Sequence, residues 1–114
     1  NTIAAVAEGL LLAAAGGADP VAVREALSGG FADSRILQEH GKRMLEGNFQ
    51  PGGKVTTQLK DLNTALEAVK DIDLPVTKLV RDLYSDAAKG ELASLDHSAI
   101  LCSLETRNKT KLRS

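Results

Sequence analysis

Glycine and proline divide the sequence into segments whose apolar residues recur at helical spacing. In one such segment, Leu59, Leu62, Leu66 and Val69 follow one another at offsets of three, four and three. These offsets place the side chains on one face of an α-helix, and no segment alternates like a strand over more than a few residues. The sequence therefore predicts an all-α fold, built from short helices with short connections.

Six helices are expected from capping and breaking residues. The first extends from about Thr2 to Ala15, and its many alanines allow close approach by other helices on more than one side. The other five helices are expected to start at Asp19, Ser34, Thr56 or Thr57, Leu74 and Asp96. The second to fifth helices are expected to end at Gly29, at Gly47, near Asp71 and at Gly90. The sixth helix carries Ala99, Ile100 and Leu104. In the fifth helix the residues expected to face inward are Val76, Leu79, Val80, Leu83 and Ala87.

The composition fits one compact domain with an aliphatic core. The chain has 114 residues, of which 43% are hydrophobic but only 3% aromatic. Fourteen basic residues nearly balance 15 acidic ones, for a net charge of −1, so no overall field attracts nucleic acid or an anionic membrane. We expect residues 1–106 to form the helical domain and the basic residues 107–114 to form a solvated, disordered tail.

Compartment and membrane signals point to a cytoplasmic protein. Cys102 is the single cysteine, so no internal disulfide can form, which suits a reducing compartment. The apolar run from Ile3 to Ala15 is interrupted by Glu8 and is too short to span a bilayer.

Two groups of residues are candidates for chemistry. Asp96, His97 and Ser98 are the residue types of a nucleophilic triad, but neighbours in sequence rarely converge on one centre, so Asp96 is better interpreted as a helix cap. His40 and Cys102 offer no metal-binding spacing with His97, and no metal site is predicted. His40 lies four residues from both Ile36 and Met44, which indicates a partly buried, hydrogen-bonded histidine.

A polar strip runs beside the leucine face of the fourth helix. Thr56, Lys60, Asn63 and Glu67 recur at offsets of four, three and four. Lys60 is either part of a solvated edge or a point charge for an anionic substrate group or a cofactor phosphate. The residues alone leave both interpretations open.

Several segments, in order, resemble one family closely. They are AAVAEGLLLAAAGGADPVAVREALSGGFADSRIL, HGKRML, FQPGG, QLKDLNTALEAV, LPVT and LDHSA. Together they resemble the C-terminal helical domain of the β-hydroxyacid dehydrogenases, which are related to 6-phosphogluconate dehydrogenase. GGFADSRIL followed by HGKRM is most similar to the 2-hydroxy-3-oxopropionate (tartronate semialdehyde) reductases of that family. A 3-hydroxyisobutyrate dehydrogenase domain and a non-catalytic helical dimerisation module remain as alternatives.

The resemblance implies a partner domain that this sequence does not contain. Family members bind NAD or NADP on an N-terminal Rossmann domain and carry a catalytic lysine on a long interdomain helix. Residue 1 is expected to lie within that helix, just past the lysine. We therefore expect a truncated C-terminal domain without a catalytic residue, inactive alone and without bound cofactor. Family members assemble as dimers or tetramers through this domain, so a homo-oligomer is expected.

The resemblance also assigns two site residues. The lysine and aspartate of the family's K-D-L segment line the cleft between the domains, and they match Lys60 and Asp61. Lys60 is expected to contact cofactor or substrate. Asp61 points about 100° further round the helix, so we expect it to orient a neighbouring group. The chain departs from the family at Gly53, where an aromatic or large apolar residue usually follows Pro-Gly.

Overall fold

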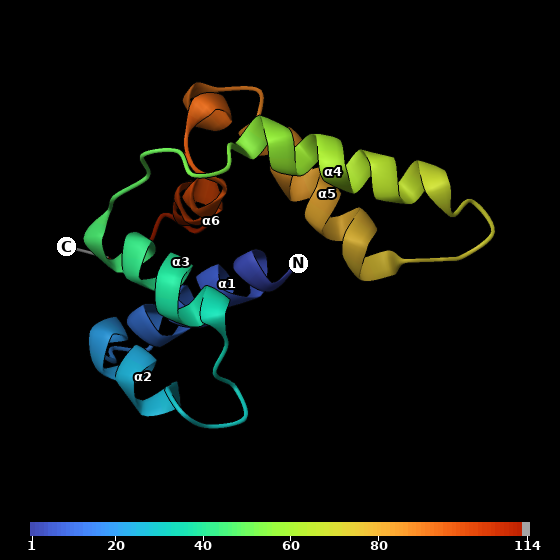
Figure 1. The fold of residues 1–114 in the computed structure, drawn as a ribbon. Coiled ribbons are helices and arrows are strands. Elements are labelled where there is room, and N and C mark those ends of the chain that lie inside the picture. The colour runs from blue at the N-terminus through green and yellow to red at the C-terminus, as the bar shows by residue number, and fades with distance from the viewer. Residues whose placement is uncertain (113–114) are drawn as a thin grey trace.

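A computed structural model describes residues 1–112, which form six α-helices, two short 3₁₀ helices and no β-strand. Figure 1 shows their arrangement. The elements are α1 (Thr2–Ala15), α2 (Pro20–Leu27), α3 (Arg35–Glu46), α4 (Val55–Ala68), α5 (Pro75–Ala87), η1 (Glu91–Ser94), η2 (His97–Ala99) and α6 (Ile100–Asn108). The predicted all-α fold is confirmed. None of the described helices combines the length and the hydropathy that a bilayer crossing requires.

Two of the predicted helix caps are confirmed. The Asp19 carboxylate accepts a hydrogen bond from the Val21 amide at the start of α2, and the Ser34 hydroxyl accepts one from the Leu37 amide at the start of α3. Each side chain satisfies an amide that has no partner inside its own helix. These short polar residues therefore fix where the two helices begin.

The boundaries of α4 and α6 differ from the predictions. Thr56 and Thr57 do not cap α4, because the helix starts earlier, after Lys54, and its first amide donates instead to the Leu95 carbonyl at 2.9 Å. The helix also ends at Ala68 rather than near Asp71. Asp96 does cap a helix, but the helix is η2, and α6 follows from Ile100.

Helix α1 lies at the centre of the molecule. It contacts α2, α3, α6 and η2, as its small, apolar surface predicted. The core around it is almost entirely aliphatic. Its buried members include Ile3, Ala7, Leu10, Leu11, Met44, Val55, Leu83, Tyr84, Ile100, Leu101 and Leu104.

Helices α4 and α5 form an antiparallel hairpin that projects from the rest of the molecule (Figure 1). Leu62 and Val80 are buried within it, whereas Val76 and Leu79 are 61% and 62% exposed. The expectation that Val76 and Leu79 face inward is therefore wrong. The periodicity of the apolar residues correctly predicts that α5 is a helix. It cannot show that the outer end of the hairpin projects past the other helices, which leaves Val76 and Leu79 uncovered.

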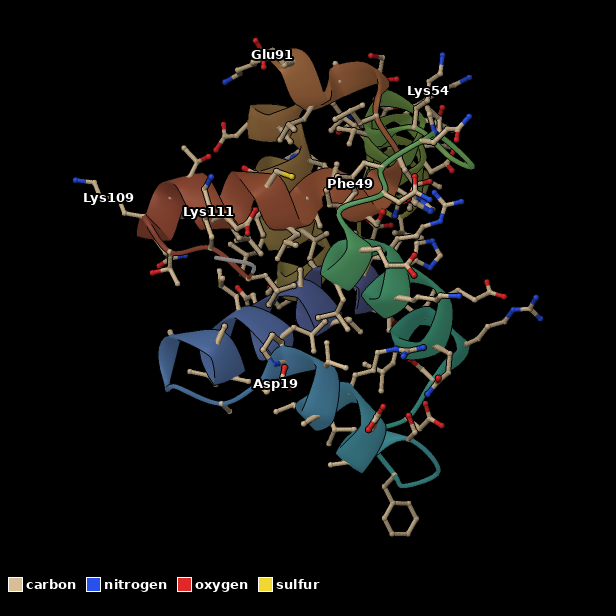
Figure 2. The ribbon with its side chains drawn as sticks, turned by 90° about the vertical axis from the view of Figure 1, so that its left-hand side faces the viewer. Asp19, Phe49, Lys54, Glu91, Lys109 and Lys111 are labelled. Atoms are coloured by element: carbon tan, nitrogen blue, oxygen red, sulfur yellow. The ribbon has the colours of Figure 1, made fainter. Side chains whose placement is uncertain are left out.

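The C-terminal segment also differs from the expected solvated tail, as far as the structure describes it. Helix α6 continues to Asn108, and Arg107 lies 3.5 Å from the Asp86 carboxylate. Leu112 is buried, and its amide donates to the Glu105 carboxylate at 2.8 Å. Lys109 and Lys111 are exposed at the end of α6 (Figure 2). The last two residues of the expected tail, 113 and 114, lie outside the described residues.

Candidate functional site

The polar strip predicted on α4 lines an open groove of about 410 Å³. Residues three and four apart on a helix are neighbours on its surface, so the strip forms one continuous face. Its lining is Thr56, Leu59, Lys60, Asn63, Thr64 and Glu67. Lys60 is exposed there, with its ammonium available to a ligand.

Arg81 of α5 joins this strip from across the hairpin. Its Nη1 donates to Asn63 Oδ1 at 3.2 Å, while its Nε donates to Asp82 Oδ1 at 2.7 Å. Sequence reasoning missed Arg81, because it is 18 positions from Asn63 and no motif connects them. Only the antiparallel pairing of α4 and α5 brings the two side chains together.

The structure separates Lys60 from Asp61. Asp61 is exposed and does not line the groove. The positions of successive residues, about 100° apart on a helix, account for this separation. Of the two residues that the family resemblance singles out, Lys60 alone lies on the groove.

The start of α4 is anchored by two of the sequence segments already noted, FQPGG and LDHSA. Their backbones pair through two hydrogen bonds, from the Asp96 amide to the Phe49 carbonyl at 2.9 Å and from the His97 amide to the Gly53 carbonyl at 2.6 Å. The Asp96 carboxylate also accepts from the amides of Gly52 and Gly53, at 2.9 and 3.1 Å. The two segments therefore act as one unit that sets the position of α4 and its groove.

Asp96 is buried, with 1% of its surface exposed. Burial by itself raises the pKa of a carboxyl group, but hydrogen bonds from Ser98, Gly52 and Gly53 outweigh it and lower the pKa of Asp96 to about 2. The Arg43 guanidinium lies 3.7 Å from the same carboxylate. Asp96 is therefore a buried, charged carboxylate that is stabilised by hydrogen bonds from the surrounding backbone and from Ser98.

His40 and His97 form a direct pair beside Asp96. Their Nε2 atoms are 2.8 Å apart, and His97 Nδ1 lies 3.4 Å from Gln58 Oε1. His40 Nδ1 is buried without a hydrogen-bond partner among the described residues. A buried nitrogen without a hydrogen is the less costly choice, so the best arrangement has His40 Nε2–H donating to His97 and His97 Nδ1–H donating to Gln58. The prediction of a partly buried, hydrogen-bonded His40 is confirmed.

The surroundings of His97 favour the uncharged form of its ring. Burial lowers the pKa of His97, and the neighbouring His40 and Arg43 lower it further, against an opposing effect of the Asp96 charge. Protonation of both rings would also replace their mutual hydrogen bond by two facing donors. The contact between His40 and His97 links α3 to η2.

This cluster has the residue types of a metal site or a triad, but its polar atoms already bond one another. His40, Asp96 and His97 offer ligand atoms within 4.8 Å of one another, a grouping that sequence spacing did not predict. However, the Asp96 oxygens already accept from four donors, and the two Nε2 atoms bond each other. The Ser98 hydroxyl donates to Asp96 and not to a histidine, so it is not activated as a nucleophile. The geometry is that of a structural hydrogen-bond network.

Known relatives match nearly the whole chain. It is 47% identical over 112 residues to 2-hydroxy-3-oxopropionate reductase of Escherichia coli K12, an alignment that covers 96% of this chain and 38% of the relative. It is 34% identical over 117 residues to a probable 3-hydroxyisobutyrate dehydrogenase-like protein, mitochondrial, of Arabidopsis thaliana, which covers all of this chain and 35% of the relative. The chain therefore spans little more than a third of the length of these relatives.

The fold also matches part of a solved dehydrogenase. The crystal structure of 3-hydroxyisobutyrate dehydrogenase from Salmonella typhimurium superposes with a TM-score of 0.83 at 22% identity, over 88% of this chain and 36% of that one. The sequence profile of the family described as "NAD-binding of NADP-dependent 3-hydroxyisobutyrate dehydrogenase" matches residues 1–104. This chain therefore belongs to the NAD-binding family of NADP-dependent 3-hydroxyisobutyrate dehydrogenases.

Proposed function

We propose that this chain is the helical part of an NAD(P)-dependent reductase that converts 2-hydroxy-3-oxopropionate to glycerate. The supporting observation is its 47% identity, over 96% of its length, to a 2-hydroxy-3-oxopropionate reductase. The reaction adds a hydride to the aldehyde carbon and a proton to the aldehyde oxygen. Oxidation of 3-hydroxyisobutyrate, named by the family profile, is the alternative reaction.

In this proposal the chain contributes the groove on α4 as one wall of the binding cleft. The nicotinamide, when bound, supplies the hydride. Lys60 suits an anionic neighbour, because it is an exposed ammonium on a face that also carries polar groups. We propose that Lys60 contacts substrate or cofactor, that Asp61 supports a neighbouring group, and that the proton donor belongs to a part of the enzyme outside this chain.

An assembly role accompanies the catalytic one. The outer half of the α4–α5 hairpin exposes Ile72, Val76 and Leu79, each more than half accessible. Apolar side chains gathered on a projecting element are typical of interaction surfaces. We propose that this hairpin contributes to a homo-oligomer. In the alternative, a non-catalytic dimerisation module, the chain would have this assembly role and the groove would bind no ligand.

The assay compares both reactions in the full-length natural polypeptide that contains this chain. We expect reduction of 2-hydroxy-3-oxopropionate, with NADH or NADPH, to have at least tenfold higher kcat/KM than oxidation of 3-hydroxyisobutyrate. A preference for 3-hydroxyisobutyrate would replace the proposed substrate. No turnover of either compound, in a protein that is folded and oligomeric, would favour the dimerisation module.

A further inference from the structure

The contact between His40 and His97 limits where this pair can take up a proton. Their Nε2 atoms are 2.8 Å apart, so one must donate and the other must accept. With His40 Nε2–H as the donor, protonation of His97 Nε2 would set two N–H groups against each other. The other bare nitrogen, His40 Nδ1, is buried without a hydrogen-bond partner among the described residues, so a proton there would be an unpaired donor. Proton uptake therefore costs the pair either its contact or a buried, unpaired N–H.

The charged groups beside the pair do not remove this cost. The Asp96 carboxylate favours a protonated His97, but its oxygens are occupied by other donors, and the Arg43 guanidinium lies 3.7 Å from it. Burial lowers the pKa of His97, and His40 and Arg43 add to this effect against the opposing charge of Asp96. The electrostatic surroundings thus agree with the hydrogen-bond geometry in favouring neutral rings.

The other elements packed against His97 contribute no charge. Gln58 of α4 places its carbonyl oxygen 3.4 Å from His97 Nδ1. The Tyr84 hydroxyl of α5 donates to the His97 carbonyl at 2.9 Å, and burial raises its pKa, so it is neutral in this range. The His97 amide donates to the Gly53 carbonyl at 2.6 Å. Because the last two bonds hold the backbone, a proton on the ring would displace the side chain and leave the backbone in place.

The first turn of α4 depends on the same segment. No side chain caps this helix, and its first amide, that of Val55, donates to the Leu95 carbonyl. The second attachment of the turn is the contact between Gln58 and His97, which at 3.4 Å is the longest bond of His97. Residues 95–97 therefore take the place of a cap, and the ring contact is the part of it that a proton would break. Thr56, in the same turn, lines the groove.

We propose that His40 and His97 form a proton-sensitive joint between α3 and the start of α4. With both rings neutral, His40 holds the His97 ring against Gln58. The uptake of one proton from solvent releases the ring and loosens the first turn of α4, while the rest of the domain stays folded. The joint rests on this geometry, and only its consequence for a ligand of the groove rests on the proposed function.

The hydrogen positions on the two rings test the joint in the unaltered protein. In the full-length natural polypeptide labelled with ¹⁵N-histidine, NMR distinguishes protonated from bare ring nitrogens. At pH 8 we expect the hydrogen of His40 on Nε2 and that of His97 on Nδ1, with His97 Nε2 gaining a proton as the pH falls. The opposite tautomers would overturn the joint, because His40 would then not be the donor that opposes protonation of His97.

Hydrogen exchange, followed by mass spectrometry, measures the loosening itself. After correction for the intrinsic effect of pH on exchange, we expect the protection of residues 55–60 to fall at least fivefold between pH 8 and pH 5.5. Helix α2, which packs on α1 and α3, is the internal reference and should change less than twofold. Equal protection of residues 55–60 at the two pH values would contradict the joint.

Two histidine variants and one control assign the effect to the pair. In His97→Asn the side chain keeps a donor for Gln58 but binds no proton, so the fall in protection should be less than twofold. In His40→Leu no donor faces His97, so protonated His97 can still bond Gln58, and the fall should again be less than twofold. Glu39→Leu, at an exposed neighbouring position of α3, should keep the fivefold fall.

These measurements separate the joint from the proposed function, because none of them requires turnover. A fivefold fall that persists in both histidine variants would overturn the joint even in an active reductase. A fall that both variants abolish would support the joint even if the protein reduces no 2-hydroxy-3-oxopropionate.

Discussion

At the residue scale, Gly53 is explained by the ring that lies against it. A Cβ atom at Gly53 would be 3.3 Å from His97 Cε1, which is closer than ordinary contact. His97 is held by His40, Gln58 and the Gly53 carbonyl, so it has little freedom to move aside. The departure from the family pattern at this position is thus compatible with the packing of the loop.

We predict that Gly53→Ala lowers the free energy of unfolding by about 1 kcal/mol, in the range for a small overpacking change. The matched control is Gly9→Ala in the middle of α1, where nothing lies within 4 Å of the added Cβ. This control should stabilise the protein by up to about 1 kcal/mol, because alanine is the better helix former. Urea denaturation of both variants measures the difference, and equal signs would contradict the crowding at His97.

The pKa of His97 predicts a stability change near neutral pH. Its folded-state pKa lies below the ordinary value of 6.5, so the unfolded chain binds more protons there than the folded chain. The free energy of unfolding should therefore fall as the pH decreases from about 7 through 6.5 and below. Thermal midpoints between pH 8 and 5 measure this fall, and His97→Asn should flatten it. An unchanged profile would mean that His97 is not held in its neutral form.

Asp96 also makes stability depend on pH, but it does so in a more acidic range, because its charged form is the one that the fold stabilises. Its pKa falls from 3.8 to about 2 on folding, so its stabilising effect is complete above pH 3.8 and is lost as the pH falls towards 2. Asp96→Asn should lower stability by roughly 1–3 kcal/mol at pH 7, because the donors of the loop lose a charged acceptor. The loss should shrink as the pH approaches 2, and a constant difference from pH 7 to 2 would contradict this account.

At the scale of the elements, the sequence predicted the helices, the short-range caps and the crowded position of α1, but not which residues of different helices meet. Asp19 and Ser34 cap helices within three residues of themselves, so their roles follow from local chemistry. The start of α4 depends instead on Leu95, some 40 positions away, and this is why Thr56 and Thr57 were misjudged. The same distinction applies to the groove. Its α4 strip could be predicted from local spacing, whereas the contribution of Arg81 from α5 could not.

The two kinds of helix start can be told apart by mutation. Ser34→Ala should lower the free energy of unfolding by about 1 kcal/mol, the usual cost of removing an N-cap side chain. Thr57→Ala should cost at most a few tenths of a kcal/mol, because Thr57 lies inside the first turn of α4 and caps nothing. Chemical denaturation of the two variants in parallel measures both values. A loss of about 1 kcal/mol or more in Thr57→Ala would instead support a capping role for this threonine.

At the scale of the whole molecule, exposed apolar side chains predict self-association. Leu12 is 75% exposed on α1, and Ile72, Val76 and Leu79 are more than half exposed on the hairpin. We expect the 114-residue chain to form dimers or larger species at high micromolar concentration, and Leu79→Glu to weaken them by placing a charge in the contact. Sedimentation velocity tests this. A clean monomer for the parent chain at that concentration would contradict the prediction.

The central claim is that the α4 groove faces the ligand of a nicotinamide-dependent reductase, and its most direct test is the kinetics of Lys60→Ala in the full-length natural polypeptide. We predict that kcat/KM for 2-hydroxy-3-oxopropionate falls at least tenfold, a loss of about 1.4 kcal/mol of transition-state stabilisation, with little change in thermal stability because Lys60 is exposed. Lys70→Ala, an exposed lysine beyond the end of α4 and outside the groove, should leave the value within twofold. An unchanged kcat/KM in Lys60→Ala would contradict the claim and return Lys60 to the solvated edge of an amphipathic helix.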